Sequence, residues 1–204
     1  MTDGFALLNE PRRPWLDAEL LKQKFLTLSS SVHPDRVHNA GDVEKLAAQE
    51  RYTALNAAYN CLREPVERLR HLLDLELGER PKDVQEIPSD LAGLFMETSR
   101  LCREAAAFLV EKEKVASPLL KVQWFERGEE WRERLAALQH TINSHREALL
   151  GELKEIDSIW DTTDAIGPKD RKAALKRLEA IYRLSSYYAR WNGQIQEIIV
   201  QLSF

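Results

Sequence analysis

The sequence predicts an all-α protein, and three observations support this fold class. Apolar residues recur at every third or fourth position along almost the whole chain of 204 residues, which is the period of an amphipathic helix. The alternating Val, Ile and Thr runs that are typical of half-buried strands are nearly absent. Prolines stand at the edges of the periodic segments, at Pro34, Pro65, Pro118 and Pro168, where they stop a helix or begin one.

Composition and charge limit the classes of function. The chain is 44% hydrophobic and 30% charged, enough to bury an ordinary core, and its net charge is -4 with charges of both signs interspersed. No basic face for a phosphate backbone is indicated, so we expect no nucleic-acid partner. No apolar run approaches the length of a membrane span, and the first residues do not resemble a signal peptide. We therefore expect a cytoplasmic protein with no membrane partner.

The two cysteines do not indicate a metal site or a disulfide. Cys61 and Cys102 each stand among helix-forming residues, and neither belongs to a CxxC pair. Two small buried hydrophobic side chains are favoured over a disulfide or a metal-binding pair. We expect no cofactor and no metal.

The first part of the chain has the pattern of a helical hairpin. A short helix is expected near residues 5–9, followed by one that Asp17 caps and that ends at or before His33, because Pro34 disfavours an α conformation in its predecessor. A polar loop, DRVHNAGD, leads to a second long helix that begins near Asp42. Apolar residues on the two helices follow steps of three and four, which is typical of antiparallel packing: Leu21, Phe25, Leu28 and Val32, then Ala48, Tyr52, Leu55, Tyr59 and Leu62. Pro65 begins a shorter helix that reaches Leu77.

The second part of the chain predicts a bundle of three long helices. A segment with two prolines and many charges, Gly78 to Asp90, predicts a domain boundary, so we expect domains at residues 1–77 and 89–204 with a linker at 78–88. Ser89, Ser117 with Pro118, and Pro168 are the expected helix starts. The apolar stripes expected to face inward are Leu91, Leu94, Thr98, Leu101, Ala105 and Phe108; Leu120, Trp124, Trp131, Leu135, Leu138, Ile142 and Leu149; and Leu178, Ile181, Ser185, Tyr188, Ile195, Ile199 and Leu202.

Two segments identify a family resemblance. The stretches LLKQKFLTLSSSVHPDR and LAAQERYTALNAAYNCLREPVERLRHLL resemble a J domain, with His-Pro-Asp between two antiparallel helices. The whole layout, including the run LFME at residues 94–97, resembles the HscB family of J-type co-chaperones of iron–sulfur cluster biogenesis. The resemblance covers nearly the full chain. It implies an L-shaped molecule made of a J domain and a C-terminal three-helix bundle.

The resemblance also implies which residues contact partners. A DnaK- or HscA-type chaperone would be contacted by His33, Pro34, Asp35 and Arg36, together with Lys22 and Lys24 on the preceding helix. An IscU-type scaffold, the client, would be contacted by Phe95, Met96, Ser99, Arg100, Arg103 and Tyr182. By this resemblance the chain binds the scaffold, stimulates the chaperone's ATPase and promotes cluster transfer. The alternative is a J-domain adaptor that delivers an unrelated client or self-associates weakly through its long helices.

The residues around His33 favour a docking corner over a catalytic site. Pro34 restricts the backbone, so His33 and Asp35 lose little conformational entropy on docking, and Asp35 offers a carboxylate that suits an arginine. His33 with Asp35 as an acid–base pair, or both with His38 as metal ligands, is disfavoured because no nucleophile, phosphate loop or further ligand cluster accompanies them. We therefore expect no catalysis by this chain. A plain helix stop with a turn-forming aspartate is the simpler alternative.

Several positions depart from the family's pattern. The run LSSSV before His33 stands where the family usually has basic residues and an aromatic one, so Lys22 and Lys24 are either docking cations or solvated helix charges. Helical geometry predicts Met96 outside the bundle and Phe95 at its flank. Ser99, Arg100 and Arg103 stand where the family has an apolar residue and acidic ones. The family's aromatic contact on the last helix falls on Ala180, and Tyr182 or Tyr187 could replace it.

Overall fold

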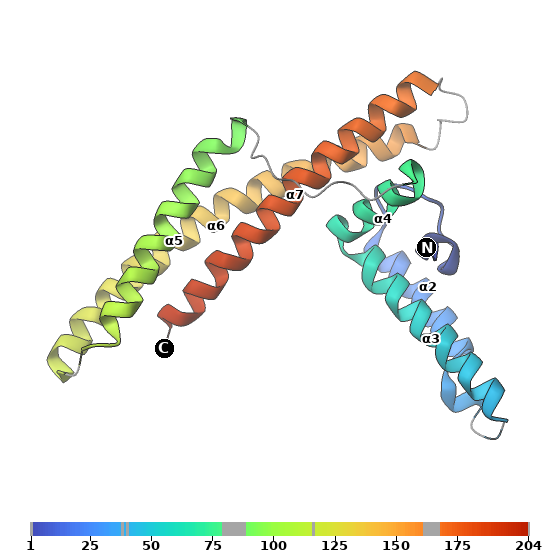
Figure 1. The fold of residues 1–204 in the computed structure, drawn as a ribbon, viewed down its shortest axis with the longest axis horizontal. Helices are drawn as coiled ribbons and strands as arrows, with labels where there is room; N and C mark the ends of the chain where they lie inside the picture. The colour runs from blue at the N-terminus through green and yellow to red at the C-terminus, as the bar shows by residue number, and fades with distance from the viewer. Residues whose placement is uncertain are drawn as a thin grey trace. The chain divides into compact units, whose positions relative to one another are not determined.

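The computed structural model describes residues 2–37, 39, 41–78, 89–115, 117–160 and 168–203 (Figure 1). Within these residues the regular elements are all helical, which confirms the all-α prediction. In chain order they are α1 (Gly4–Leu7), α2 (Ala18–Ser31), the 3-10 helix η1 (Pro34–Val37), α3 (Asp42–Arg63), α4 (Pro65–Leu77), the 3-10 helix η2 (Ser89–Leu91), α5 (Ala92–Lys112), α6 (Pro118–Trp160) and α7 (Pro168–Leu202).

The chain forms two compact units. The first consists of residues 1–82 and 151–182, and the second of residues 83–150 and 183–204. The two ends of α6 and of α7 therefore belong to different units. The expected linker, residues 78–88, lies outside the described residues except for Gly78. The boundaries expected at 77 and 89 stay a prediction.

Local chemistry sets the ends of α2 and α4. The Asp17 carboxylate accepts hydrogen bonds from the backbone N–H groups of Glu19 and Leu20, both at 2.9 Å, so it caps α2 as predicted. Ser31 is the last residue of α2, three residues before Pro34. Pro65 is the first residue of α4, and Gly78 ends that helix in the left-handed region at φ 72°, which glycine adopts without a Cβ penalty.

The core of the first unit joins α1, α2, α3 and α4. The fully buried side chains that these four helices and the residue after α1 contribute are Phe5, Leu8, Leu21, Leu62, Leu69, Leu72 and Leu73. Phe25 of α2 and Tyr59 of α3 stack with ring centroids 4.3 Å apart, which fixes the hairpin that carries η1. Burial of each of these large apolar side chains stabilises the fold by roughly 1.5–3 kcal/mol.

Residues 12–15 tie α4 and the last turns of α6 together inside the first unit. Asp157 of α6 is buried; it accepts two hydrogen bonds from Arg13 Nε, at 2.9 and 3.1 Å, and one from the Trp15 backbone N–H at 3.1 Å. The indole N–H of Trp160 donates to the Arg12 carbonyl at 2.7 Å. From α4, Arg68 donates to the Pro14 carbonyl at 3.0 Å, and burial lowers the pKa of this guanidinium to about 10.

The second unit packs α5, the first part of α6 and the second part of α7 around one core. Its buried side chains include Leu101, Ala105, Phe108, Leu135, Leu138, Ile142, Tyr188, Trp191, Ile195 and Leu202. Hydrogen bonds join Gln139 to Gln196 at 3.2 Å and Asn143 to Asn192 at 2.6 Å. Residue numbers thus rise along α6 as they fall along α7, so the predicted antiparallel pairing of these two helices is confirmed.

Two details of the predicted bundle are wrong. Ser89 does not cap α5; it begins η2, and α5 starts three residues later with Leu91 at the N-cap and no side-chain cap bond. Leu120 was expected in the core but is 46% exposed. The pairing of α6 with α7 places Leu202, the last residue of α7, opposite residue 133 of α6. The first turns of α6 therefore extend past the end of α7, which leaves Leu120 uncovered.

The cysteines are both free thiols. Cys102 is buried in the core of the second unit, as predicted. Cys61 is half-buried, with its Sγ 3.7 Å from the Glu67 carbonyl oxygen. Burial raises the pKa of both thiols, which makes them poor nucleophiles at neutral pH.

Candidate functional site

The His-Pro-Asp corner is the 3-10 turn η1 at the end of the α2–α3 hairpin (Figure 1). The Arg36 N–H donates to the His33 carbonyl at 3.0 Å, which closes the turn. The Asp35 side chain is 89% exposed and the His33 side chain 43%. Both groups thus reach solvent at a turn whose backbone is held by its own hydrogen bond.

His33 is held in place by contacts on two sides. Its ring meets Tyr52 of α3 edge-on, with centroids 5.1 Å apart. Its Nδ1 accepts from the Asp35 backbone N–H at 3.3 Å, which places the proton of the neutral ring on Nε2. The same Nδ1 lies 3.4 Å from Asp35 Oδ2, a contact that becomes an ion pair only when the ring is protonated. The neutral ring therefore keeps an Nε2–H donor beside an exposed carboxylate.

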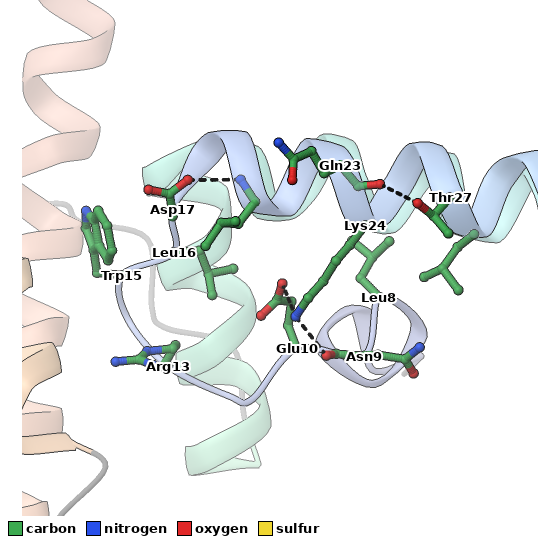
Figure 2. A pocket seen from close by; sticks show the side chains of 12 residues that line it. Leu8, Asn9, Glu10, Arg13, Trp15, Leu16, Asp17, Gln23, Lys24 and Thr27 are labelled. Atoms are coloured by element: carbon green, nitrogen blue, oxygen red, sulfur yellow. Dashed lines mark hydrogen bonds and ion pairs between the residues drawn. The ribbon is translucent and has the colours of Figure 1, made fainter.

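The three predicted cations differ in their surroundings. Lys22 and Arg36 are exposed. Lys24 crosses a groove of about 640 Å³ between α2 and residues 8–17, as Figure 2 shows. Its Nζ lies 2.8 Å from Glu10 Oε1 and 3.3 Å from the Asn9 carbonyl oxygen. Glu10 is a partner that the sequence did not indicate, because fourteen positions separate the two residues and the helical period says nothing about a segment outside the helix.

The alternative of a metal site at the corner named His33, Asp35 and His38 as ligands, and of these His33 Nδ1 and Asp35 Oδ2 lie 3.4 Å apart. Among the described residues, no group of three or more His, Cys, Asp and Glu side chains is placed to hold a metal ion. His38, the third residue of that alternative, lies outside the described residues.

The predicted client-binding residues of α5 share one side of that helix. At 100° per residue, Phe95, Ser99, Arg103, Met96 and Arg100 span an arc of about 140°. Met96 is 66% exposed, which confirms its predicted place outside the core. Arg100 and Arg103 are exposed, and Ser99 is partly exposed.

Phe95 is half-buried and rests on the bundle. Its ring centroid lies 6.2 Å from that of Trp191 on α7, and Trp191 is itself buried. Trp191 was not among the predicted inward-facing residues. It stands three residues after Tyr188 and four before Ile195, a spacing that places it on the same stripe. Phe95 thus packs against the buried ring of Trp191.

The other residues predicted to bind the client are less suited to it than Phe95 and Met96. Arg100 forms an ion pair with Glu104 at 3.1 Å, and Arg134 lies 3.7 Å from the same carboxylate, so Glu104 reduces the positive charge of this surface. Tyr182 is half-buried and belongs to the first unit, whereas the α5 residues belong to the second. Its part in client binding stays a prediction. Tyr187 is 7% exposed and packs against Trp191, which makes it a core residue.

Comparison with known proteins decides the family. No protein-family model matches the chain. Over 172 residues it is 34% identical to a Cupriavidus taiwanensis protein named "Co-chaperone protein HscB homolog", and the match covers 80% of this chain and 93% of that protein. This chain belongs to the HscB co-chaperone family.

Other HscB homologues are similar over part of the chain. One from Paraburkholderia phymatum is 42% identical over 71 residues, which is 35% of this chain and 41% of that protein. One from Aromatoleum aromaticum is 29% identical over 157 residues, covering 74% of this chain and 75% of that protein. As a member of the HscB family, this chain is a co-chaperone and has a chaperone as partner.

Solved HscB structures share the fold. The Vibrio cholerae HscB chaperone matches with a TM-score of 0.63 at 19% identity, over 98% of this chain and 99% of that one. Human HscB matches with a TM-score of 0.64 at 18% identity, over 96% and 81%. The predicted HscB fold, a J domain followed by a C-terminal helical bundle, is thereby confirmed. No helix among the described residues is both long and apolar enough to span a membrane.

Proposed function

We propose that this HscB-family co-chaperone binds an IscU-type iron–sulfur scaffold and stimulates the ATPase of a DnaK- or HscA-type chaperone, so that the cluster passes to recipient proteins. The observation that supports it best is the geometry of the corner, where the exposed Asp35 carboxylate and the His33 ring stand together on a closed turn. The chain itself would carry out no chemistry. It would need no cofactor and would act in the cytoplasm.

The corner suits a cationic partner group. A carboxylate that is 89% exposed can accept two hydrogen bonds from one arginine, which is the strongest pairing open to it. The ordered turn and the ring contact with Tyr52 reduce the conformational entropy lost when the corner docks. Burial of Asp35 against the chaperone then strengthens the pair, because the local dielectric constant falls.

The α5 surface suits an adaptable client contact. Met96 is unbranched and polarizable, so its side chain can fit an irregular apolar patch. Phe95, supported by Trp191, supplies a rigid ring next to it. A central apolar anchor with a polar rim, here Ser99 and Arg103, is the usual composition of a binding hot spot.

The test of the corner is the substitution Asp35→Asn. It removes the charge but keeps the shape, and we expect it to reduce stimulation of a purified DnaK-type chaperone's steady-state ATPase by at least about tenfold, the usual effect of losing a charged hydrogen-bond partner at an interface. Because Asp35 is exposed, circular dichroism and thermal unfolding should match the unsubstituted protein. Undiminished stimulation by the variant would exclude the corner as the docking element.

The test of the client surface is scaffold binding measured by calorimetry. Met96→Ala should weaken the affinity about tenfold, and Phe95→Ala should weaken it at least as much, in line with loss of interface anchors. Val110→Ala is the matched control, since Val110 is also exposed and lies on α5 roughly 21 Å farther along the helix. Absent scaffold binding, or binding unaffected at Phe95 and Met96, would favour the alternative of an adaptor for an unrelated client.

A further inference from the structure

Met96 stands on α5 at a place where its helical neighbours leave its sulfur uncovered. Its side chain is 66% exposed. A side chain on a helix leans toward the N-terminus of that helix, so Met96 lies over the turn that holds Ala92 and Gly93. Ala92 is small and exposed, and a Cβ added to Gly93 would meet no atom of the described residues within 4 Å. The thioether of Met96 is therefore open to small molecules in the solvent.

The cysteine sulfurs are less reactive. Cys102 is buried and Cys61 is half-buried, and burial raises the pKa of both thiols. Peroxides react with the thiolate form of cysteine, which is scarce when the pKa is raised. A thioether has no proton to lose, so its reactivity does not depend on that equilibrium. Met1, the second methionine of the chain, lies outside the described residues. Among the residues that the structure describes, Met96 thus carries the most accessible sulfur atom.

Oxidation of this thioether by a peroxide needs only access to the sulfur. A lone pair of the Met96 sulfur attacks one peroxide oxygen, and the O–O bond breaks as the S–O bond forms. The other oxygen leaves as water or an alcohol, with the proton that the transferred oxygen carried. The sulfur loses two electrons and the peroxide gains them. The product is a sulfoxide, a polar side chain that accepts hydrogen bonds.

Arg100 is placed to donate to the oxygen of such a sulfoxide. It stands four residues after Met96 on α5, and residues with this spacing have Cβ atoms about 5–6 Å apart. The guanidinium donates through Nη1 to the two carboxylate oxygens of Glu104, at 3.1 and 3.2 Å. A guanidinium has five N–H donors, so it can bind a second acceptor as well. The oxidised side chain would then have a partner on its own helix.

We propose that Met96 is a site of reversible oxidation by peroxides, and that its sulfoxide, bound by Arg100, releases the client from the α5 surface. This inference rests on the proposed function, because it takes Phe95 and Met96 as the anchors of client binding. Methionine sulfoxide reductases return the side chain to the thioether, which makes the modification reversible. Peroxides would thus stop client delivery and leave the corner at His33 and Asp35 unchanged.

The affinity falls because a polar group takes the place of an apolar anchor. An apolar client patch that covers Met96 would remove the hydrogen bonds of the sulfoxide oxygen to water and to Arg100. A buried acceptor that is left without a partner weakens binding by at least about tenfold. The sulfoxide form should therefore bind the scaffold at least as weakly as Met96→Ala.

The experiment treats this protein alone with hydrogen peroxide at mildly acidic pH, where thiols stay protonated, and removes the peroxide with catalase before scaffold is added. Mass spectrometry of proteolytic peptides should place one added oxygen on Met96 and none on Cys61 or Cys102. Calorimetry should then show a scaffold affinity at least about tenfold lower than that of the untreated protein. Incubation with the two methionine sulfoxide reductases, one for each epimer of the sulfoxide, should restore the affinity.

Two variants and one separate activity are the controls. Met96→Leu has an apolar side chain without a thioether, so its scaffold affinity, whatever its value, should be the same before and after peroxide. In Arg100→Ala the sulfoxide loses its partner on the helix, so peroxide should lower the affinity by a smaller factor than in the unsubstituted protein. Stimulation of a DnaK-type chaperone's ATPase without scaffold, which depends on the exposed Asp35, should not change on oxidation, and neither should the circular dichroism.

The outcomes separate this inference from the proposed function. The inference is wrong if Met96 resists peroxide that oxidises free methionine, if its sulfoxide binds scaffold normally, or if peroxide weakens Met96→Leu equally. A loss of helicity or of ATPase stimulation on oxidation would show general damage and would also overturn it, and an equal loss of affinity in Arg100→Ala would overturn the part assigned to Arg100. In each of these cases scaffold binding by the untreated protein upholds the proposed function. If the untreated protein binds no scaffold, both are wrong.

Discussion

The buried carboxylate of Asp157 is expected to hold residues 12–15 against the end of α6, and the substitution Asp157→Asn tests this. The asparagine keeps the shape and one oxygen, which can still accept from the Trp15 N–H. It replaces the other oxygen with an NH₂ group that faces the guanidinium of Arg13, donor against donor. The charge of Arg13 then loses the counter-charge of Asp157, at a site where the Arg13 side chain is 27% exposed.

The expected loss follows from these contacts. Removing one partner of a fully buried ion pair destabilises a protein by 3–5 kcal/mol, and the partial exposure of Arg13 reduces this to about 2–3 kcal/mol of unfolding free energy. Arg13→Met, which keeps the apolar stem and removes the cation, should cost a similar amount. In the double variant most of the second loss should vanish, so the coupling free energy should be about 2 kcal/mol.

The assay is urea unfolding followed by tryptophan fluorescence, since Trp15 and Trp160 both lie at this contact. With a denaturant slope of about 2 kcal/mol per molar, the unfolding midpoint of each single variant should fall by about 1 M. If the loss of unfolding free energy in the double variant equals the sum of the two single losses within about 0.5 kcal/mol, then Arg13 and Asp157 do not stabilise each other and the reasoning is wrong.

Two further predictions concern the first unit. Burial lowers the pKa of His71, whose Nε2 accepts from the Gly4 N–H at 2.9 Å, while the charges of Asp3 and Asp74 act in the opposite direction. The unfolded state then binds the proton more readily than the folded one, so the unfolding free energy should be constant above about pH 6.5 and fall as the pH drops below it. In His71→Gln, whose amide oxygen can accept without titrating, urea midpoints measured from pH 7.5 to 5 should depend less on pH, and an unchanged pH dependence would count against His71. Gly78→Ala should lower the unfolding free energy by about 1 kcal/mol, because a Cβ meets no neighbour there and only the φ of 72° opposes it; a thermal midpoint equal to that of the unsubstituted protein would contradict this.

Much of the fold was predictable because helix ends depend on nearby residues. Asp17 caps α2 through N–H groups two and three positions away, and Pro65 begins α4 by its own ring. The start of α5 was wrong by two residues, because Ser89, the right residue type for a cap, lies in a 3-10 turn and Leu91 is at the N-cap. The prediction for Leu120 failed for a different reason: α7 ends before it reaches that turn of α6, and Leu120 is 46% exposed.

The sequence by itself determined the all-α class, the hairpin with its proline-bounded corner, and the exposure of Met96, since period, caps and prolines act over a few residues. Only the tertiary structure decided that Lys24 is held by Glu10, and that Asp157 is held by Arg13 from 144 positions away. These ion pairs depend on which distant segments the tertiary fold brings together, and the spacing of charges along the sequence does not predict that. The availability of each cation for a partner therefore had to be read from the folded chain.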